Sequence, residues 1–126
     1  MKKLIYLAVV LSSASAFACP NLSGTFACPA RNQQDQASIT KIENKINQDG
    51  TTTYRFSHTN KEGKVVVNEF SASPSGVIKD GKTYKCVGNG LERPGRDGVV
   101  RVSSINKAGN LETGKAGEAT HVCVRK

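Results

Sequence analysis

The chain has 126 residues, of which 37% are hydrophobic and 22% are charged, and its 18 Lys and Arg against 10 Asp and Glu give a formal net charge of +8. A chain of this length and composition supplies one domain, which excludes a large enzyme, a multidomain assembly, a transmembrane protein and a coiled coil. Four cysteines and the absence of Trp are the other compositional features that bear on fold and function.

Residues 1–18 have the features of a secretory signal peptide. Lys2 and Lys3 precede an apolar segment that is too short to span a bilayer, and Ala16-Phe17-Ala18 places small residues at the cleavage positions. We expect cleavage before Cys19, followed by export to the periplasm or secretion. Because Lys2 and Lys3 leave with this segment, the remaining single domain, residues 19–126, carries a formal net charge of +6.

A Cys directly after the cleavage point also allows a second interpretation, a bacterial lipoprotein with an acyl anchor on Cys19. The sequence Ala16-Phe17-Ala18-Cys19 lacks the Leu of a usual lipobox and has a bulky Phe17 in its middle. Acylation of Cys19 would also leave an odd number of thiols in an exported domain. Both observations argue against the anchor.

The composition after residue 18 predicts strands joined by turns. Val outnumbers Leu ten to three there, and Thr, Ser and Gly are frequent. Asp49-Gly50, Glu62-Gly63 and Asp80-Gly81 are hairpin signals, because Gly adopts a positive φ without steric cost. The predicted strands, in chain order, cover residues 22–28, 37–44, 52–59, 64–72, 76–79, 83–87, 99–106 and 119–125.

One of these elements has two interpretations. Residues 37–44 are predicted as a strand, but the spacing of Ile39, Ile42 and Ile46 also fits the apolar stripe of a helix over residues 37–47. In the neighbouring segments, Tyr54, Phe56 and their alternating polar neighbours favour strands. The expected fold is therefore all-β, a small antiparallel up-and-down meander, whichever form residues 37–47 take.

Eight short strands of this kind can close into a barrel or form an open sandwich, and closure is favoured because it removes exposed edges. An even number of cysteines in a small exported domain predicts two disulfides, for which three pairings exist. If the last strand runs antiparallel beside the first, Cys123 lies near Cys19, which leaves Cys28 to pair with Cys86. The absence of C-x-x-C spacing argues against a thioredoxin-like site and against zinc.

The first predicted strand contains Gly24-Thr25-Phe26 and resembles the opening strand of the lipocalins and avidins, in which a Gly-x-Trp aromatic plugs one end of the barrel. The resemblance implies a lipocalin-like barrel and structural roles for Gly24 and Phe26. Avidin-type biotin sites use several Trp side chains. Since this chain has none, the resemblance carries no expectation of biotin binding.

The sequence contains no recognisable catalytic or metal-binding motif. His58 and His121 are the only histidines, and neither has a motif around it. His121 and Cys123 share a strand face, but a disulfide removes the thiolate that a Cys-His pair needs. We therefore expect a protein that is not an enzyme and that has no cofactor and no bound metal.

The first functional hypothesis is an exported binding protein whose small barrel holds a small-molecule ligand at its open end, with Phe56, Phe70 and Tyr84 as candidate contacts. The second arises from residues 88–98, which carry four Gly, one Pro and two Arg and are expected to form a long loop. Arg93 and Arg96, with Arg101 nearby, are candidate ligands for an acidic group.

In this alternative, the protein is an interaction module that binds an acidic envelope or extracellular partner through its basic face and the 88–98 loop. Neither hypothesis includes nucleic acid as an expected partner. Lys and Arg are spread evenly along the chain, and aromatic residues are not interleaved with them as stacking platforms require.

Overall fold

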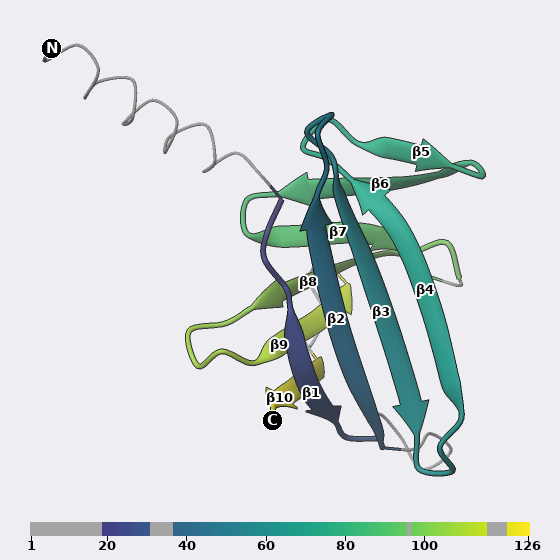
Figure 1. Cartoon of the computed structure of the whole chain (residues 1–126), viewed down its shortest axis with the longest axis vertical. Coiled ribbons are helices and arrows are strands. Elements are labelled where there is room, and N and C mark those ends of the chain that lie inside the picture. Colours follow the sequence, from purple (N-terminus) through teal and green to yellow (C-terminus); the bar gives the residue numbers. More distant parts are fainter. Residues whose placement is uncertain (1–18, 31–36, 96, 116–120) are drawn as a thin grey trace, which may run out of the picture.

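A computed structural model of the chain describes residues 19–30, 37–95, 97–115 and 121–126, and these form a single antiparallel sheet that curls into a nearly closed barrel (Figure 1). The strands are β1 (Gly24–Cys28), β2 (Ser38–Ile46), β3 (Thr52–Asn60), β4 (Val65–Ala72), β5 (Val77–Lys79), β6 (Lys82–Val87), β7 (Gly90–Pro94), β8 (Val100–Ile105), β9 (Leu111–Lys115) and β10 (His121–Arg125). The expected all-β, up-and-down architecture is confirmed.

Two strands were not predicted from the sequence, so the prediction of eight strands is wrong for the described residues. Strand β9 carries a single large apolar residue, Leu111, so its sequence shows no clear alternation of apolar and polar residues. Strand β7 lies inside residues 88–98, where a long loop was expected. The helical interpretation of residues 37–47 is also wrong, because Ser38–Ile46 is strand β2.

Residues 88–98 contain a tight hairpin turn, between strands β6 and β7, that their composition did not predict. Val87 pairs with Gly90, so Gly88-Asn89 forms a two-residue loop, and the φ of +58° at Gly88 is the positive value that a type II′ turn requires at its first central position. Gly90 lies so close to β8 that an added Cβ would be 2.8 Å from Val102 Cγ1. The glycines of this segment therefore form a turn and permit close strand contact.

The three hairpin signals that were identified are confirmed. Asp49-Gly50, Glu62-Gly63 and Asp80-Gly81 all lie in turns between consecutive strands. In the last of them, Lys79 pairs with Lys82, and both loop residues have positive φ (53° and 74°). This is the geometry of a type I′ turn, whose twist matches that of the flanking strands.

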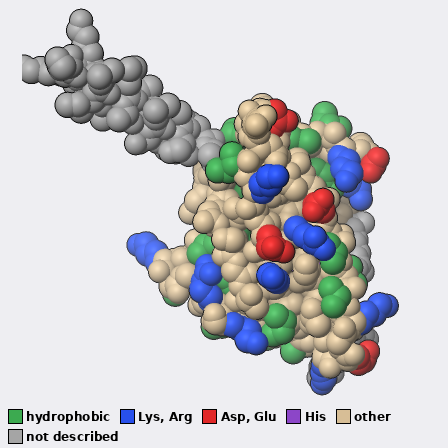
Figure 2. Space-filling model, in the orientation of Figure 1, with side chains coloured by type: hydrophobic (Ala, Val, Ile, Leu, Met, Phe, Trp, Pro, Cys, Tyr) green, Lys and Arg blue, Asp and Glu red, His purple; other side chains and the backbone are tan. Residues whose placement is uncertain are grey.

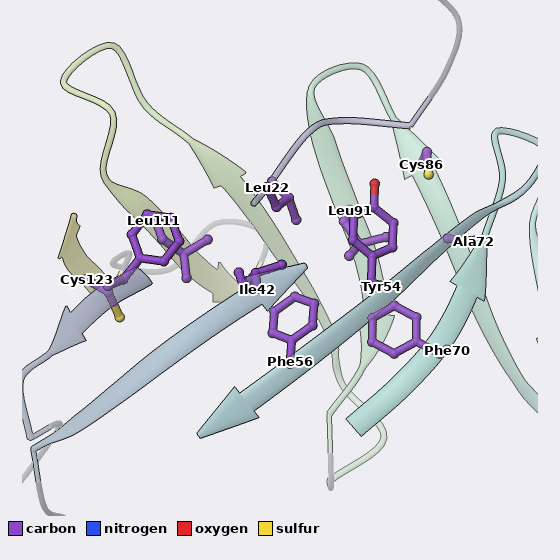
Figure 3. Close-up of a cluster of buried hydrophobic side chains, with 11 residues drawn as sticks. Leu22, Ile42, Tyr54, Phe56, Phe70, Ala72, Cys86, Leu91, Leu111 and Cys123 are labelled. Carbon is purple, nitrogen blue, oxygen red and sulfur yellow. The ribbon is translucent and has the colours of Figure 1, made fainter. Parts of the chain in front are cut away.

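The strand register divides the side chains into an inward and an outward set. Cross-strand partners such as Ile42 and Phe56, or Leu111 and Cys123, share a face and are buried together. Figure 3 shows how the inward side chains converge from several strands. The buried hydrophobic residues are Leu22, Phe26, Ile42, Tyr54, Phe56, Phe70, Ala72, Cys86, Leu91, Leu111 and Cys123.

The pairing of the first strand in the chain with the last makes the sheet continuous. Strand β1 lies between β2 and β10, which joins the β2–β4 half to the β6–β9 half, and Figure 1 shows the second half crossing behind the first. The edge strands are β4 and β5. Near them, Ser73 bridges to Lys85, and its carbonyl accepts a 2.9 Å hydrogen bond from the Cys86 N–H. This contact almost completes the ring.

All four cysteines form disulfides, but the pairing predicted from the sequence is wrong: Cys19 pairs with Cys86, and Cys28 pairs with Cys123. Strand β10 does run antiparallel to β1, as expected. Its register aligns Ala27 with Val124, so Cys123 comes opposite the end of β1 rather than its beginning. Cys19, five residues before β1, reaches β6 instead.

Phe26, the central residue of β1, is fully buried in the core. The Arg125 guanidinium lies over its ring, with Cζ 4.8 Å from the ring centre, and donates hydrogen bonds to the carbonyls of Gly109 and Ser23. A side chain at Gly24 would collide with this guanidinium. The burial of Phe26 agrees with the plugging role that the resemblance implies for it.

In the part of the chain that the structure describes, no helix has the length and apolar character needed to cross a membrane.

The observed disulfides predict a specific peptide map. Digestion of non-reduced protein is expected to yield one linked peptide pair containing Cys28 and Cys123 and another containing Cys19 and Cys86, as read by mass spectrometry. Replacing Cys28 and Cys123 together with Ser is expected to lower the free energy of unfolding by about 2–4 kcal/mol, because the unfolded chain loses a cross-link. A Cys19–Cys123 peptide pair would contradict the register of β1 and β10.

The buried ring of Phe26 predicts a large effect of truncation. Phe26→Ala is expected to lower the free energy of unfolding by about 3–5 kcal/mol, as measured by chemical denaturation, because it leaves a cavity under Arg125. Val124→Ala, on the outward face of the neighbouring strand, serves as the control and should change stability by no more than about 0.5 kcal/mol. Equal effects of the two substitutions would exclude the plugging role.

Candidate functional site

Four of the five residues selected from the sequence as binding candidates lie together in the structure. Phe56, Phe70, Tyr84 and Arg93 come from strands β3, β4, β6 and β7, respectively. The fifth candidate, Arg96, lies outside the described residues. Positions scattered over nearly forty residues of sequence thus converge inside one barrel.

Strand register explains the convergence. Phe70 is paired with Tyr54, and Phe56 is two residues further along β3, so the two Phe side chains are diagonal neighbours on the inward face. On the other half of the barrel, Lys85 is paired with Glu92, which places Tyr84 beside Arg93 on the opposite, inward face.

The rings form a nearly parallel series, which we call the aromatic cluster (Tyr54, Phe56, Phe70 and Tyr84). The centroid of Phe70 is 5.9 Å from Tyr54, 5.7 Å from Phe56 and 4.6 Å from Tyr84, with interplanar angles of 29°, 25° and 19°. Figure 3 shows Tyr54, Phe56 and Phe70 side by side. Contacts of this kind favour offset stacking, and they align the ring planes across the two halves of the barrel.

Arg93 completes the cluster. Its guanidinium carbon lies 4.2 Å from the centre of the Phe56 ring, within the range of a cation–π contact. The side chain is half-buried, whereas Phe56 is only 1% exposed. A planar cation is therefore held directly against the core rather than projected into solvent.

Burial decreases along the cluster and defines its accessible end. Tyr54 is fully buried, Phe70 is 6% exposed, and Tyr84 and Arg93 are half-buried. Solvent therefore reaches the cluster mainly at Tyr84 and Arg93. Tyr54 and Phe56 support this end from beneath.

Tyr54, which was not a candidate from the sequence, anchors the inner end of the cluster. Its hydroxyl donates a 2.6 Å hydrogen bond to the Pro20 carbonyl, next to the Cys19–Cys86 disulfide. Burial raises the pKa of this hydroxyl well above its usual value. Its alternation with Phe56 was visible in the sequence, but only the pairing with Phe70 reveals its place in the cluster.

Arg101 lies next to Arg93 by register and pairs with Asp97 at 3.2 Å. A hydrogen bond from the Val99 N–H, with smaller contributions from the charges of Arg101 and Lys115, holds the pKa of Asp97 below its usual value. The rim of the barrel beside the aromatic cluster is therefore built from basic side chains around one ionised carboxylate.

Both histidines occupy inward strand positions. His58 Nδ1 lies 2.9 Å from Thr40 Oγ1, and its ring centre is 6.3 Å from that of Phe56. His121 is paired with Thr113, and the nearby Cys123 is bonded to Cys28. In the same described ranges, no three His, Cys, Asp or Glu side chains are grouped as a metal ion requires.

Comparison with known proteins found no matching family model, no matching curated protein and no matching solved structure. The geometry of the aromatic cluster and Arg93 is accordingly the main evidence on function.

Proposed function

We propose that this protein is an exported, non-enzymatic binding protein that holds a small-molecule ligand at the Tyr84–Arg93 end of the aromatic cluster. The observation that carries the proposal is the convergence of Phe56, Phe70, Tyr84 and Arg93 from four strands on one face. Flat apolar surface beside one oriented polar group is the usual composition of a small-molecule site.

The rigidity of the surroundings supports this proposal. Each cluster member is on a strand rather than a loop, and no buried side-chain nitrogen or oxygen of the described residues lacks a hydrogen-bond partner. A site held in this way loses little conformational entropy when a ligand binds.

The proposed export is supported by the expected signal peptide and by the two disulfides, which persist in oxidising compartments such as the periplasm or the extracellular medium.

The alternative, binding of an acidic partner through an outer basic face and an 88–98 loop, has less support. Residues 90–94 are strand β7, and Arg93 lies over the core ring of Phe56. Figure 2 shows Lys and Arg interspersed with Asp and Glu on the visible face, which β2–β4 form in the same orientation in Figure 1. A mixed surface of this kind attracts an acidic macromolecule only weakly.

Native mass spectrometry of protein purified from its own compartment tests the proposed function. The wild-type protein is expected to carry an extra mass that leaves on denaturation without reductant, and Tyr84→Ala is expected to reduce this bound fraction about tenfold by removing a stacked ring. The substitution should leave folding intact because Tyr84 is half-buried.

Lys85→Ala is the matched control, since Lys85 is the next residue on β6 and faces outward. It should retain the extra mass. A wild-type protein that runs at the bare mass of its disulfide-bonded chain, or equal retention by Tyr84→Ala and Lys85→Ala, would contradict a ligand at this site.

A further inference from the structure

The two edges of the sheet are protected to different degrees. The strand order ends in β4 on one side and in β5 on the other (Figure 1). Native proteins keep other chains from pairing with such edges by making the strand very short or by placing Lys or Pro on it. Strand β5 is three residues long and ends in Lys79, which lies opposite Lys82. Strand β4 has eight residues with neither Lys nor Pro, and Glu69 is its single charged residue.

One part of β4 has an open edge. Beyond its last residue, Ser73 bridges to Lys85 on β6. For Val65–Glu69, β3 is the only pairing strand among the residues that the structure describes. The outer backbone groups of this part are therefore available to a strand from another chain.

The geometry of the β3–β4 hairpin identifies those backbone groups. The Asn60 N–H donates a 3.0 Å hydrogen bond to the Lys64 carbonyl, and hydrogen-bonded pairs alternate with non-hydrogen-bonded pairs along an antiparallel ladder. Val65, Val67 and Glu69 occupy the non-hydrogen-bonded positions. Their N–H and C=O groups therefore point away from β3, towards the open edge.

Three consecutive valines occupy this open edge. Val65 is 54% exposed, Val66 is 48% exposed and Val67 is 44% exposed. Val65 and Val67 belong to the outward face and Val66 to the inward face, so the strand is apolar on both sides. Single exposed apolar residues are ordinary on a protein surface, but a run of them on an unpaired edge is typical of a strand that pairs with another chain.

A second copy of the chain fits this edge. Antiparallel pairing about a two-fold axis at Val66 brings Val66 against the partner's Val66, and it brings Val65 against the partner's Val67 and Val67 against the partner's Val65. In this register, Val65 and Val67 exchange their outer backbone hydrogen bonds with the partner. The exposed valine side chains are covered at the same time, so one contact satisfies both features of the edge.

The polar residues beside the valines favour this orientation. The register sets Lys64 opposite the partner's Asn68 and next to the partner's Glu69, whose amide and carboxylate oxygens both accept hydrogen bonds from an ammonium group. Parallel pairing would instead set Lys64 beside the partner's Lys64, where like charges repel. Sliding the copy along the edge towards Ser73 would set the partner's β3–β4 turn against β6, so β6 limits the register.

We propose that the protein associates with a second copy of itself through the Val65–Val67 edge of β4, as a two-fold symmetric dimer in which the two sheets become continuous. The inference does not depend on the proposed ligand site, whose accessible residues, Tyr84 and Arg93, lie on β6 and β7. The contact centres on three residues from each chain, which is smaller than a standard interface. We therefore expect a weak dimer, with a Kd on the order of 10–100 μM.

Sedimentation equilibrium of the disulfide-bonded protein, from about 1 to 500 μM, tests the association. Val65→Lys is expected to weaken it at least about tenfold, because it places an ammonium group against the partner's Val67. Val124→Lys is the matched control and should dimerise like the wild type. Val124 is 55% exposed, as Val65 is 54% exposed, but it lies on β10, which has a paired strand on each side. Thermal unfolding checks that both variants are folded.

A cross-linking variant tests the register. At the two-fold axis, the two Val66 positions form a non-hydrogen-bonded pair with Cα atoms about 4.5 Å apart, which a disulfide can bridge. Val66→Cys is therefore expected to give a disulfide-linked dimer on a non-reducing gel under mild oxidation. Val124→Cys, at a similarly exposed position away from the edge, should remain a single chain.

Three results would overturn the inference. The first is a wild-type protein that remains monomeric to about 500 μM. The second is an equal effect of Val65→Lys and Val124→Lys, which would place the interface elsewhere. The third is a dimer that Val65→Lys weakens but that Val66→Cys does not cross-link, which would exclude the two-fold register at Val66.

Discussion

The pairing of β1 with β10 is the constraint on which the rest of the molecule depends. It joins strands β2–β4 to strands β6–β9, and without it the chain would form two small sheets that each expose an apolar face. The Cys28–Cys123 disulfide fixes this pairing, and Arg125, at the end of β10, covers Phe26 on β1. The contact of Arg93 with Phe56 crosses between the two halves and so exists only while they are joined.

A core this small gives its aromatic residues two roles. Residues 19–126 contain three Phe and two Tyr, and four of these five rings belong to the aromatic cluster. Truncating Phe56 or Phe70 would therefore remove core packing together with any binding surface. Tyr84 and the neighbouring Arg93 are half-buried, so substitutions there remove less core packing.

Local sequence chemistry was sufficient to predict three of the hairpin turns, eight of the ten strands in the described residues and the inward rings. Each of these depends on a few consecutive residues: an Asp-Gly pair defines a turn, and alternation defines a face. Strand β7 was missed because Gly and Pro dominate its surroundings, although its second residue, Leu91, is fully buried. The disulfide pairing was missed because it depends on the register between strands at opposite ends of the chain, which no local signal reports.

The proximity of Arg93 to Phe56 likewise depends on pairing across the barrel. The sequence indicated Phe56, Phe70 and Tyr84 for one hypothesis and Arg93 for another, since residues 88–98 resembled a solvated loop. Strand β7 turns Arg93 inward, so the structure merges the two candidate sites into one.

Lys and Arg are spread evenly along the sequence, but their net positive charge is not divided evenly between the two faces of the sheet. Outward strand positions carry equal numbers of basic and acidic residues, so they contribute nothing to the net charge of the domain. The inward strand positions carry the remaining strand basic residues of the described chain, Lys79, Lys82, Arg93, Arg101, Lys115 and Arg125, of which Arg125 covers Phe26. The Arg125 guanidinium donates hydrogen bonds to two backbone carbonyls. Arg93, Arg101 and Lys115 follow one another across β7, β8 and β9, so strand register and not their spacing in the sequence brings these three side chains together beside the aromatic cluster.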